Sequence, residues 1–150
     1  MSANDFVIRP VGPDERAAWE PLWQGYLTFY EMSVTAETTD VLWKRLHNPA
    51  EPMFVLGAYR NGTLIGIAQY IFHRSCWTIG DYCYLQDLFV APDVRGTGAG
   101  RALISAVERE ARKQGASRIH WLTKEDNHSA RALYDQMADR SGFIQYRKLF

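Results

Sequence analysis

The chain has 150 residues, with 17 basic and 17 acidic side chains and a formal net charge of zero. This length fits one domain of about 100–200 residues, so we expect residues 1–150 to form a single domain. Hydrophobic residues make up 47% of the chain and charged residues 23%, which argues against a disordered protein. The balanced charge argues against a protein that mainly grips nucleic acid, because such proteins are usually strongly basic.

The two parts of the chain differ in charge. Residues 1–90 hold six basic and ten acidic side chains, whereas residues 91–150 hold eleven basic and seven acidic ones. The first part would suit a cationic ligand and the second an anionic one. Two solvated faces that differ by chance would give the same numbers, so both interpretations stay open.

The sequence shows no targeting signal. The first six residues form no apolar run, and no apolar segment of signal-peptide length comes after them, so we expect no signal peptide. No apolar run reaches the roughly 18 residues that a transmembrane helix needs, and we expect neither a membrane nor a nucleic acid as partner. Cys76 and Cys83 lack the CxxC spacing of metal and redox motifs. These features predict a cytoplasmic protein with two free thiols and no bound metal.

The first half of the chain predicts a strand, two helices and a hairpin. The residue pattern predicts strands at 6–10, 53–59 and 64–72. It predicts helices at 14–31 and 39–48. Apolar residues recur at i, i+3 and i+4 in the first helix, where Pro21 can introduce a kink. Asn61-Gly62 is a strong hairpin signal, because a type I′ turn needs positive φ at both central positions.

The second half predicts alternating strands and helices. The residue pattern predicts strands at 82–90, 118–123 and 143–149. It predicts helices at 98–114 and 127–137. The unit from residue 82 to 123 is a strand–helix–strand crossover, so its two strands should be parallel. The three strands from 53 to 90 should be antiparallel. Together these elements predict one mixed α/β domain.

A glycine-rich loop, Arg95-Gly-Thr-Gly-Ala-Gly100, joins the strand at 82–90 to the next helix. Glycines let the backbone turn sharply and expose several N–H groups, and a helix N-terminus carries partial positive charge. The loop can therefore hold a phosphate or pyrophosphate, although a purely structural turn is the alternative. A P-loop needs Gly-Lys-Ser/Thr, and a dinucleotide fingerprint needs Gly where this chain has Arg101, so neither motif matches.

The loop matches Arg-x-x-Gly-x-Gly and resembles the pyrophosphate loop of the GNAT superfamily of acyl-CoA-dependent N-acyltransferases. Asp87-Leu-Phe-Val90 resembles that family's central strand. Asn127-x-x-Ala130-x-x-Leu133-Tyr134 and Gly142-Phe143 resemble its second conserved segment. The resemblance covers residues 54–150 and is strongest to the diamine (polyamine) and yeast-type histone/polyamine acetyltransferases. It implies a central mixed sheet of six to seven strands, flanked by about four helices.

The resemblance also implies the reaction: an acetyl group passes from acetyl-CoA to a primary amine of a small, polyamine-like or otherwise cationic molecule. The amine would attack directly in a ternary complex, with Tyr134 as the general acid. Backbone groups of Leu88, Phe89 and Val90 would bind the pantetheine arm. Backbone N–H groups of the loop would bind the pyrophosphate, and one face of the helix at 127–137 would line the groove. The implied cofactor residues are Leu88, Phe89, Val90, Arg95, Gly96, Thr97, Gly98, Ala99, Gly100, Arg101, Asn127, Ala130 and Tyr134.

The general base and the acceptor pocket are less determined. Diamine acetyltransferases commonly have Glu where this chain has Gln86, and an amide cannot act as a base. Asp87 or Glu31, acting through water, are the replacements. Aromatic faces beside a carboxylate suit an alkylammonium group, although the same aromatic spacing also fits a core face. The implied acceptor residues are Trp23, Tyr26, Tyr30, Glu31 and Gln86.

Two other functions fit the same residues. A protein or peptide lysine N-acetyltransferase would need a wide, open acceptor groove. A non-catalytic CoA-binding sensor is compatible with the missing Glu at Gln86, although Tyr134 argues against it. The resembling subfamilies also imply a homodimer.

Overall fold

A computed structural model describes residues 5–150. Five strands form one sheet in the order β1-β2-β3-β4-β5. The first four strands pair antiparallel, and β5 pairs parallel with β4, which confirms the predicted meander and crossover. The strands are β1 (Val7–Pro10), β2 (Met53–Arg60), β3 (Thr63–His73), β4 (Tyr82–Val90) and β5 (Arg118–His120).

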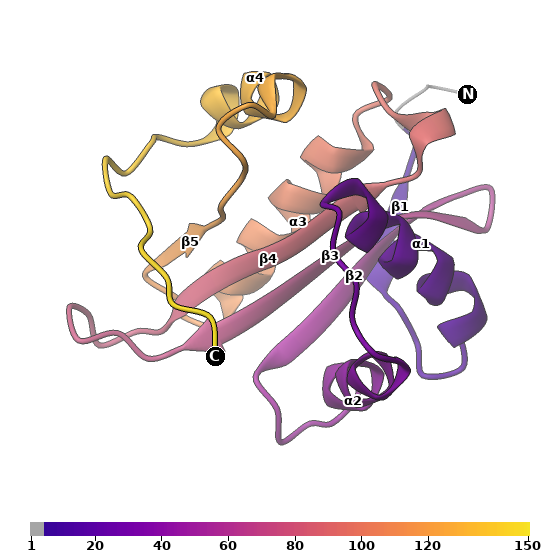
Figure 1. Ribbon diagram of the computed structural model, residues 1–150, viewed down its shortest axis with the longest axis horizontal. Helices are drawn as coiled ribbons and strands as arrows, with labels where there is room; N and C mark the ends of the chain where they lie inside the picture. Colours follow the sequence, from indigo (N-terminus) through magenta and orange to yellow (C-terminus); the bar gives the residue numbers. More distant parts are fainter. Residues whose placement is uncertain (1–4) are drawn as a thin grey trace.

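Of the four α-helices, the first two lie on one face of this sheet, the third lies on the other face, and the fourth lies apart from the faces, beyond β4 (Figure 1). They are α1 (Arg16–Phe29), α2 (Ala36–Leu46), α3 (Ala99–Lys113) and α4 (His128–Met137), with a short 3₁₀ helix, η1 (Pro92–Val94), before the glycine-rich loop. The predicted hairpin between β2 and β3 is confirmed, because Asn61 and Gly62 both have positive φ (51° and 78°). None of the described helices is long and apolar enough to cross a membrane.

Two apolar clusters hold the layers together. On one face, α1 and α2 pack onto the sheet through Trp19, which is completely buried, and Trp43. Gly25 allows this close approach, since a Cβ atom there would lie 2.8 Å from the ring of Phe89. On the other face, α3 buries Leu103 and Val107 against β2 and β3. The sheet is therefore covered on both sides along most of its length.

Several predicted boundaries differ from the structure. α1 continues through Pro21 without a break. α2 begins at Ala36 rather than at residue 39 or 40, because the Thr35 hydroxyl caps it by accepting a hydrogen bond from the Thr38 N–H (3.1 Å). β5 ends at His120 rather than at residue 123.

The last predicted strand, at residues 143–149, is wrong. Within the described part of the chain, residues 139–150 form no helix or strand, so the sheet has five strands rather than six to seven. A strand needs a neighbouring edge for its backbone hydrogen bonds, and β5, the outer strand on this side, is only three residues long. The apolar residues of the segment consequently remain exposed; they are Phe143, Ile144, Tyr146, Leu149 and Phe150.

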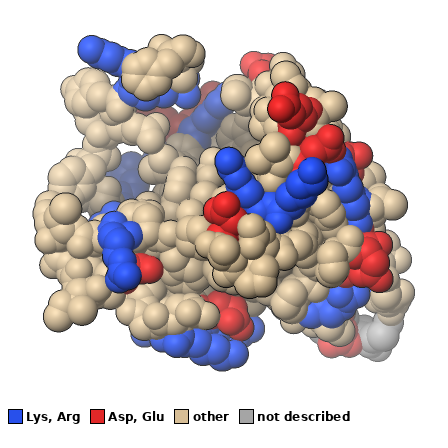
Figure 2. All heavy atoms as spheres, turned by 90° about the horizontal axis from the view of Figure 1, so that it is seen from below, with Lys and Arg blue, Asp and Glu red and all other residues tan. Residues whose placement is uncertain are grey.

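On the face of the molecule that Figure 2 shows, acidic and basic side chains are not separated into two regions. Figure 2, seen from below Figure 1, shows Asp and Glu side chains interspersed with Lys and Arg side chains. Several of these charges form ion pairs, among them Arg16 with both Glu20 and Asp40. On this face, the charge difference between the two parts of the sequence therefore does not appear as two separate regions.

Candidate active site

The central feature of the site is an open edge of β4. β5 pairs only with Tyr82–Tyr84, so among the described residues Leu85–Val90 have no strand beside them on the side that faces α4 (Figure 1). The register with β3 shifts between Gln69 and Tyr70, which leaves Gln86 as an extra residue, a β-bulge. An open edge presents a row of backbone donors and acceptors that an extended molecule can pair with.

The glycine-rich loop lies at the end of this edge. Gly96 and Gly98 have φ values of 79° and 93°, which only glycine adopts easily. α3 begins directly after Gly98, and the first N–H groups of a helix have no acceptor within it. The Thr97 hydroxyl fixes the loop by donating to the Val94 carbonyl (2.6 Å). The loop and the helix N-terminus thus form a site that suits a phosphate group.

Arg95 holds the loop against the sheet. Its side chain donates to the Val90 carbonyl (3.1 Å) and lies over the rings of Phe29 and Phe89. Its backbone N–H already donates to the Pro92 carbonyl (3.5 Å). The loop N–H groups that remain for an anion are therefore those that come after Arg95.

α4 forms the wall opposite the open edge. Arg101 at the start of α3 donates to Gln136 of α4, and the Asn127 side chain donates to the Thr123 hydroxyl (3.1 Å). Tyr134 packs edge-on against Trp121, with ring centroids 5.5 Å apart. Burial raises the pKa of Tyr134 to about 12, so its hydroxyl stays protonated across the neutral range. Ala130, one turn before Tyr134, is half-buried on the same helix.

Asp87 is the buried carboxylate of the site. Only 7% of its surface is exposed, and its Oδ2 atom accepts a hydrogen bond from Gln69 Nε2 (2.8 Å). Gln69 in turn accepts from the Trp19 indole N–H (2.7 Å). Burial raises the pKa of Asp87, and the polar contacts with Gln69 and Tyr26 oppose this rise. The Asp87 carboxylate is therefore a stronger base than an exposed aspartate.

A hollow of about 450 Å³ opens beside Asp87 and Gln86, between α2 and residues of β2, β3 and β4. One face of α2 forms a wall with apolar residues such as Val41 and Leu42. Glu37 and Arg45 are the charged residues on that wall. Trp23 also lines the hollow, yet it is mainly a core residue: it is 7% exposed, and its indole N–H donates to Thr39 (3.1 Å).

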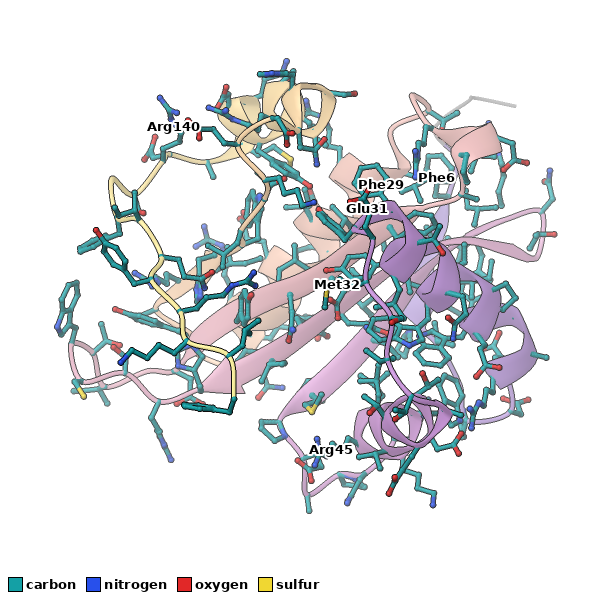
Figure 3. The ribbon with its side chains drawn as sticks, in the orientation of Figure 1. Phe6, Phe29, Glu31, Met32, Arg45 and Arg140 are labelled. Carbon is teal, nitrogen blue, oxygen red and sulfur yellow. The ribbon has the colours of Figure 1, made fainter. Side chains whose placement is uncertain are left out.

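The other predicted acceptor residues lie on the α4 side of Asp87. Tyr26 is half-buried, and its hydroxyl donates to the Gln86 carbonyl (3.4 Å). Tyr30 is close enough to Tyr134 to raise the pKa of Tyr134 further, and Lys124 Nζ lies 5.8 Å from the Tyr30 ring centroid. Glu31 is exposed just after α1, with a φ of 53° (Figure 3). The predicted residues thus divide into two groups, one on each side of Asp87.

Sequence reasoning missed Gln69, Glu37 and Arg45. Gln69 could have been found as the one polar residue in the apolar interior of β3. Glu37 and Arg45 look like ordinary charged residues of a surface helix, because nothing in the local pattern shows the hollow. Among residues 5–150, no three His, Cys, Asp or Glu side chains gather where they could hold a metal ion. Cys76 and Cys83 are free thiols.

Comparison with known proteins agrees with this geometry. The family model described as "Acetyltransferase (GNAT) family" matches residues 19–138. A D-amino-acid N-acetyltransferase of Saccharomyces cerevisiae, HPA3, is 28% identical over 99% of this chain and 93% of its own length. A thialysine N-epsilon-acetyltransferase of Caenorhabditis elegans is 29% identical over 88% of this chain and 81% of its own length. The solved aminoglycoside N-acetyltransferase AAC(6')-Iy, in complex with CoA, superimposes with a TM-score of 0.79 at 19% identity, covering 95% of this chain and 94% of that chain.

The open strand edge and the glycine-rich loop are compatible with an acyltransferase that uses a CoA thioester as its donor. The family match covers most of the chain, and the chain belongs to the acetyltransferase (GNAT) family. The protein is an acetyl-CoA-dependent N-acetyltransferase.

Proposed function

We propose that the protein transfers the acetyl group of acetyl-CoA to the primary amine of a small, polyamine-like or other cationic molecule. The observation that carries this proposal is the bulge at Gln86, which lies at the open edge of β4 and also beside the hollow. A donor thioester and an acceptor amine can therefore approach the same point of the sheet. The yeast and nematode relatives, named for their action on D-amino acids and thialysine, support a small-molecule acceptor.

The size of the hollow favours a small acceptor over a protein tail. Small-molecule sites usually have volumes of about 300–1,000 Å³, and the hollow of about 450 Å³ lies in that range. Its wall combines apolar side chains with a few polar groups, which is typical of sites that orient one small ligand.

The donor would bind along β4. Backbone groups of Leu88–Val90 would pair with the pantetheine arm as an added strand does, and a backbone N–H there would stabilise the thioester oxygen as its negative charge grows. The N–H groups of Gly96–Arg101 would hold the pyrophosphate at the start of α3. When bound, acetyl-CoA supplies an activated acetyl group.

The acceptor amine must lose a proton before it attacks. A lysine-like amine has a pKa of about 10.4, so deprotonation at neutral pH costs roughly 4 kcal/mol. We assign the base role to Asp87, acting through water, because it lies beside the hollow and burial raises its pKa. Glu31 is the second candidate, although it is exposed and does not line the hollow.

Tyr134 is the proposed general acid. The amine nitrogen forms a bond to the acetyl carbon, the carbon–sulfur bond breaks, and the departing thiolate takes the Tyr134 proton. The proton lost by the amine passes through water to the carboxylate. The raised pKa of Tyr134 keeps its hydroxyl protonated until the thiolate departs.

We also propose that two copies associate. Large apolar residues of the segment at 139–150, such as Phe143 and Tyr146, are exposed in the single chain. Exposed apolar patches commonly mark interaction surfaces. Sedimentation of the full chain would show a dimer, and a chain that stays monomeric at high concentration would contradict this association.

Release of free thiol from acetyl-CoA across a panel of amines tests the reaction. We expect turnover with small primary amines and much slower turnover with a lysine-containing peptide. Binding of acetyl-CoA without turnover of any amine would contradict catalysis and favour a CoA sensor. Faster turnover of the peptide would favour the protein acetyltransferase instead.

A further inference from the structure

Gln69 is a buried amide that lies between α1 and the proposed base. Only 3% of its surface is exposed, and the two residues before it in β3, Ile67 and Ala68, are completely buried. In the sheet it stands directly opposite Asp87, beside the bulge of β4. A buried amide destabilises the fold unless its oxygen and its nitrogen both have hydrogen-bond partners.

The two partners of Gln69 fix the orientation of its amide. The Trp19 indole N–H can only donate, and it meets the amide oxygen (2.7 Å). An ionised carboxylate can only accept, and Asp87 Oδ2 meets the amide nitrogen (2.8 Å). The reverse orientation would bring two donors together at Trp19 and two acceptors together at Asp87. The fold therefore presents an N–H group to the carboxylate and holds one of its oxygens in place.

The other groups around Asp87 support its charge less than Gln69 does. The titratable groups that face it or line the same hollow, from α1, α2 and β4, are Tyr26, Glu37, Arg45 and Tyr84. Glu37 is a second carboxyl group, and among the described residues no ion pair joins Arg45 to Asp87. Burial raises the pKa of Asp87, and the hydrogen bond from Gln69 is the largest effect that lowers it.

We propose that Gln69 is a positioning residue, which holds the Asp87 carboxylate ionised and in place beside the bulge so that it can accept the proton of the acceptor amine. This inference rests on the proposed acetyl transfer with Asp87 as the base. It adds a residue that acts through that base. Trp19 supports the same role, because its indole N–H determines which end of the amide faces Asp87.

Two simpler roles for Gln69 predict different results. Gln69 lines the hollow, and loss of a direct contact with the acceptor would raise KM by the same factor at every pH. A purely structural role in the core would lower stability and leave the pH dependence of the activity unchanged. The pH profile therefore separates the positioning role from both.

Thr39→Val is the matched control for a structural role. Thr39 is 2% exposed, accepts the indole N–H of Trp23 (3.1 Å) and does not line the hollow. Like loss of Gln69, this change leaves a buried tryptophan N–H without its side-chain acceptor in the layer under α1 and α2. It does so without touching Asp87.

The test measures kcat/KM for one small primary amine across the acid and neutral range, by thiol release from acetyl-CoA. The pH dependence of kcat/KM reports the pKa of the essential base, and the amine titrates identically with every variant. Gln69→Met keeps an unbranched side chain but removes the N–H donor. We expect its acid limb to move to higher pH by about one unit, which below the midpoint equals about a tenfold loss of kcat/KM. Trp19→Phe should move the limb in the same direction by less, and Thr39→Val should not move it.

Two further measurements exclude other causes of a shift. Circular dichroism at each pH verifies that the variant is folded, since acid unfolding would imitate a moved limb, and Trp19→Phe serves as the test if Gln69→Met unfolds. Carbon-13 NMR of the Asp87 carboxyl group, identified by its loss in Asp87→Asn, measures the same pKa without substrate. An unmoved limb in Gln69→Met, or a Thr39→Val limb that moves as far, would overturn the positioning role.

The NMR titration also separates this inference from the proposed reaction. A pKa of Asp87 that rises in Gln69→Met, in a protein that acetylates no amine, would keep the effect of Gln69 on Asp87 and reject acetyl transfer. Turnover that depends on Asp87 but keeps its wild-type midpoint in Gln69→Met would keep acetyl transfer and reject Gln69 as a positioning residue.

Discussion

On one side of β4, α1 and α2 bury three tryptophans and a polar chain from Trp19 through Gln69 to Asp87. On the other side, α4 buries none of its ten residues. The two sides also differ in the segments to which their helices connect: α2 leads into the paired strand β2, whereas α4 leads into the exposed segment at 139–150.

This difference in packing predicts different roles for the two sides in binding the two substrates. The proposed acceptor side is packed by α1 and α2, so hydrogen bonds within the fold itself fix the position of Asp87. The donor side has an open strand edge and a loosely packed wall, and both can contact a long cofactor only when it is bound. We therefore expect the acceptor side to determine specificity, and the donor side to gain order from acetyl-CoA.

The largest effect should come from Tyr134 on the donor side. Tyr134→Phe removes the proton donor and keeps the ring against Trp121, so kcat should fall about 100-fold with little change in acetyl-CoA affinity. Steady-state kinetics and calorimetry measure the two quantities. Tyr146→Phe, in the exposed terminal segment, is the control and should have no effect. An unchanged kcat in Tyr134→Phe would remove Tyr134 as the acid.

Acetyl-CoA should stabilise the two sides unequally. At a concentration 100 times its Kd, a ligand raises the free energy of unfolding by about 2.7 kcal/mol. Hydrogen exchange should slow most in Gly96–Arg101 and in residues 121–137, and least in α1 and α2. Uniform slowing across both sides would contradict the comparison, because it would mean that the cofactor stabilises the whole fold to the same degree.

Asp87→Asn should lower activity and raise stability at once. Loss of the base should reduce kcat/KM at neutral pH at least tenfold, whereas the control Glu31→Gln should change it much less. In the folded protein the pKa of Asp87 is raised, so its ionisation favours the unfolded state as pH rises through the ordinary range of a carboxyl group. Removing that charge should raise Tm by about 2–4 °C, the shift that ~1 kcal/mol produces in a domain of this size. If Asp87→Asn lowered both the activity and Tm, Asp87 would have a structural role only.

Glu15 should have a smaller effect, on stability alone. Its carboxylate accepts hydrogen bonds from the Gly12 N–H (2.7 Å), from Arg9 and from the Tyr59 hydroxyl (3.0 Å), and these bonds, with Arg9 the largest cause, lower its pKa to about 2. Glu15→Gln should lower the free energy of unfolding by ~1–2 kcal/mol.

The pH dependence of that loss provides the check. Because the folded pKa is lowered, the stabilisation is complete above the unfolded pKa of about 4.3 and disappears as pH falls towards 2. Denaturant unfolding at several pH values should show the wild type and Glu15→Gln converging in acid. Glu20→Gln, which removes an exposed ion pair with Arg16, should cost less than ~0.5 kcal/mol at any pH.

Local chemistry determined which elements could be predicted from the sequence. The hairpin at Asn61-Gly62 and the loop at Gly96 and Gly98 each require positive φ. Because glycine adopts positive φ easily, its presence in the sequence indicates such turns. The strand–helix–strand crossover can be inferred from hydrophobic periodicity and a general rule of handedness. These elements therefore appear in the structure where the sequence placed them.

Features that depend on distant residues could not be predicted in this way. Gln69 and Asp87 lie 18 positions apart and meet only when β3 pairs with β4. Arg45 lines the hollow only because α2 packs beside β2. The segment at 143–149 has the composition of a strand, but strand formation depends on a neighbouring edge that the single chain does not provide.

The extra residue in β4 also decides which face of the sheet each neighbour enters. Cys83 and Leu85 belong to the cluster under α3, whereas Phe89 belongs to the cluster under α1 and α2, and Asp87 points into that same layer through Gln69. The odd-numbered residues of β4 are thus buried along the whole strand. Before Gln86 they face α3, and after Gln86 they face α1 and α2. Deleting that one residue would shift the alternation and send Asp87 and Phe89 towards α3. A single extra position therefore determines which face of the sheet Phe89 and the proposed base Asp87 both enter.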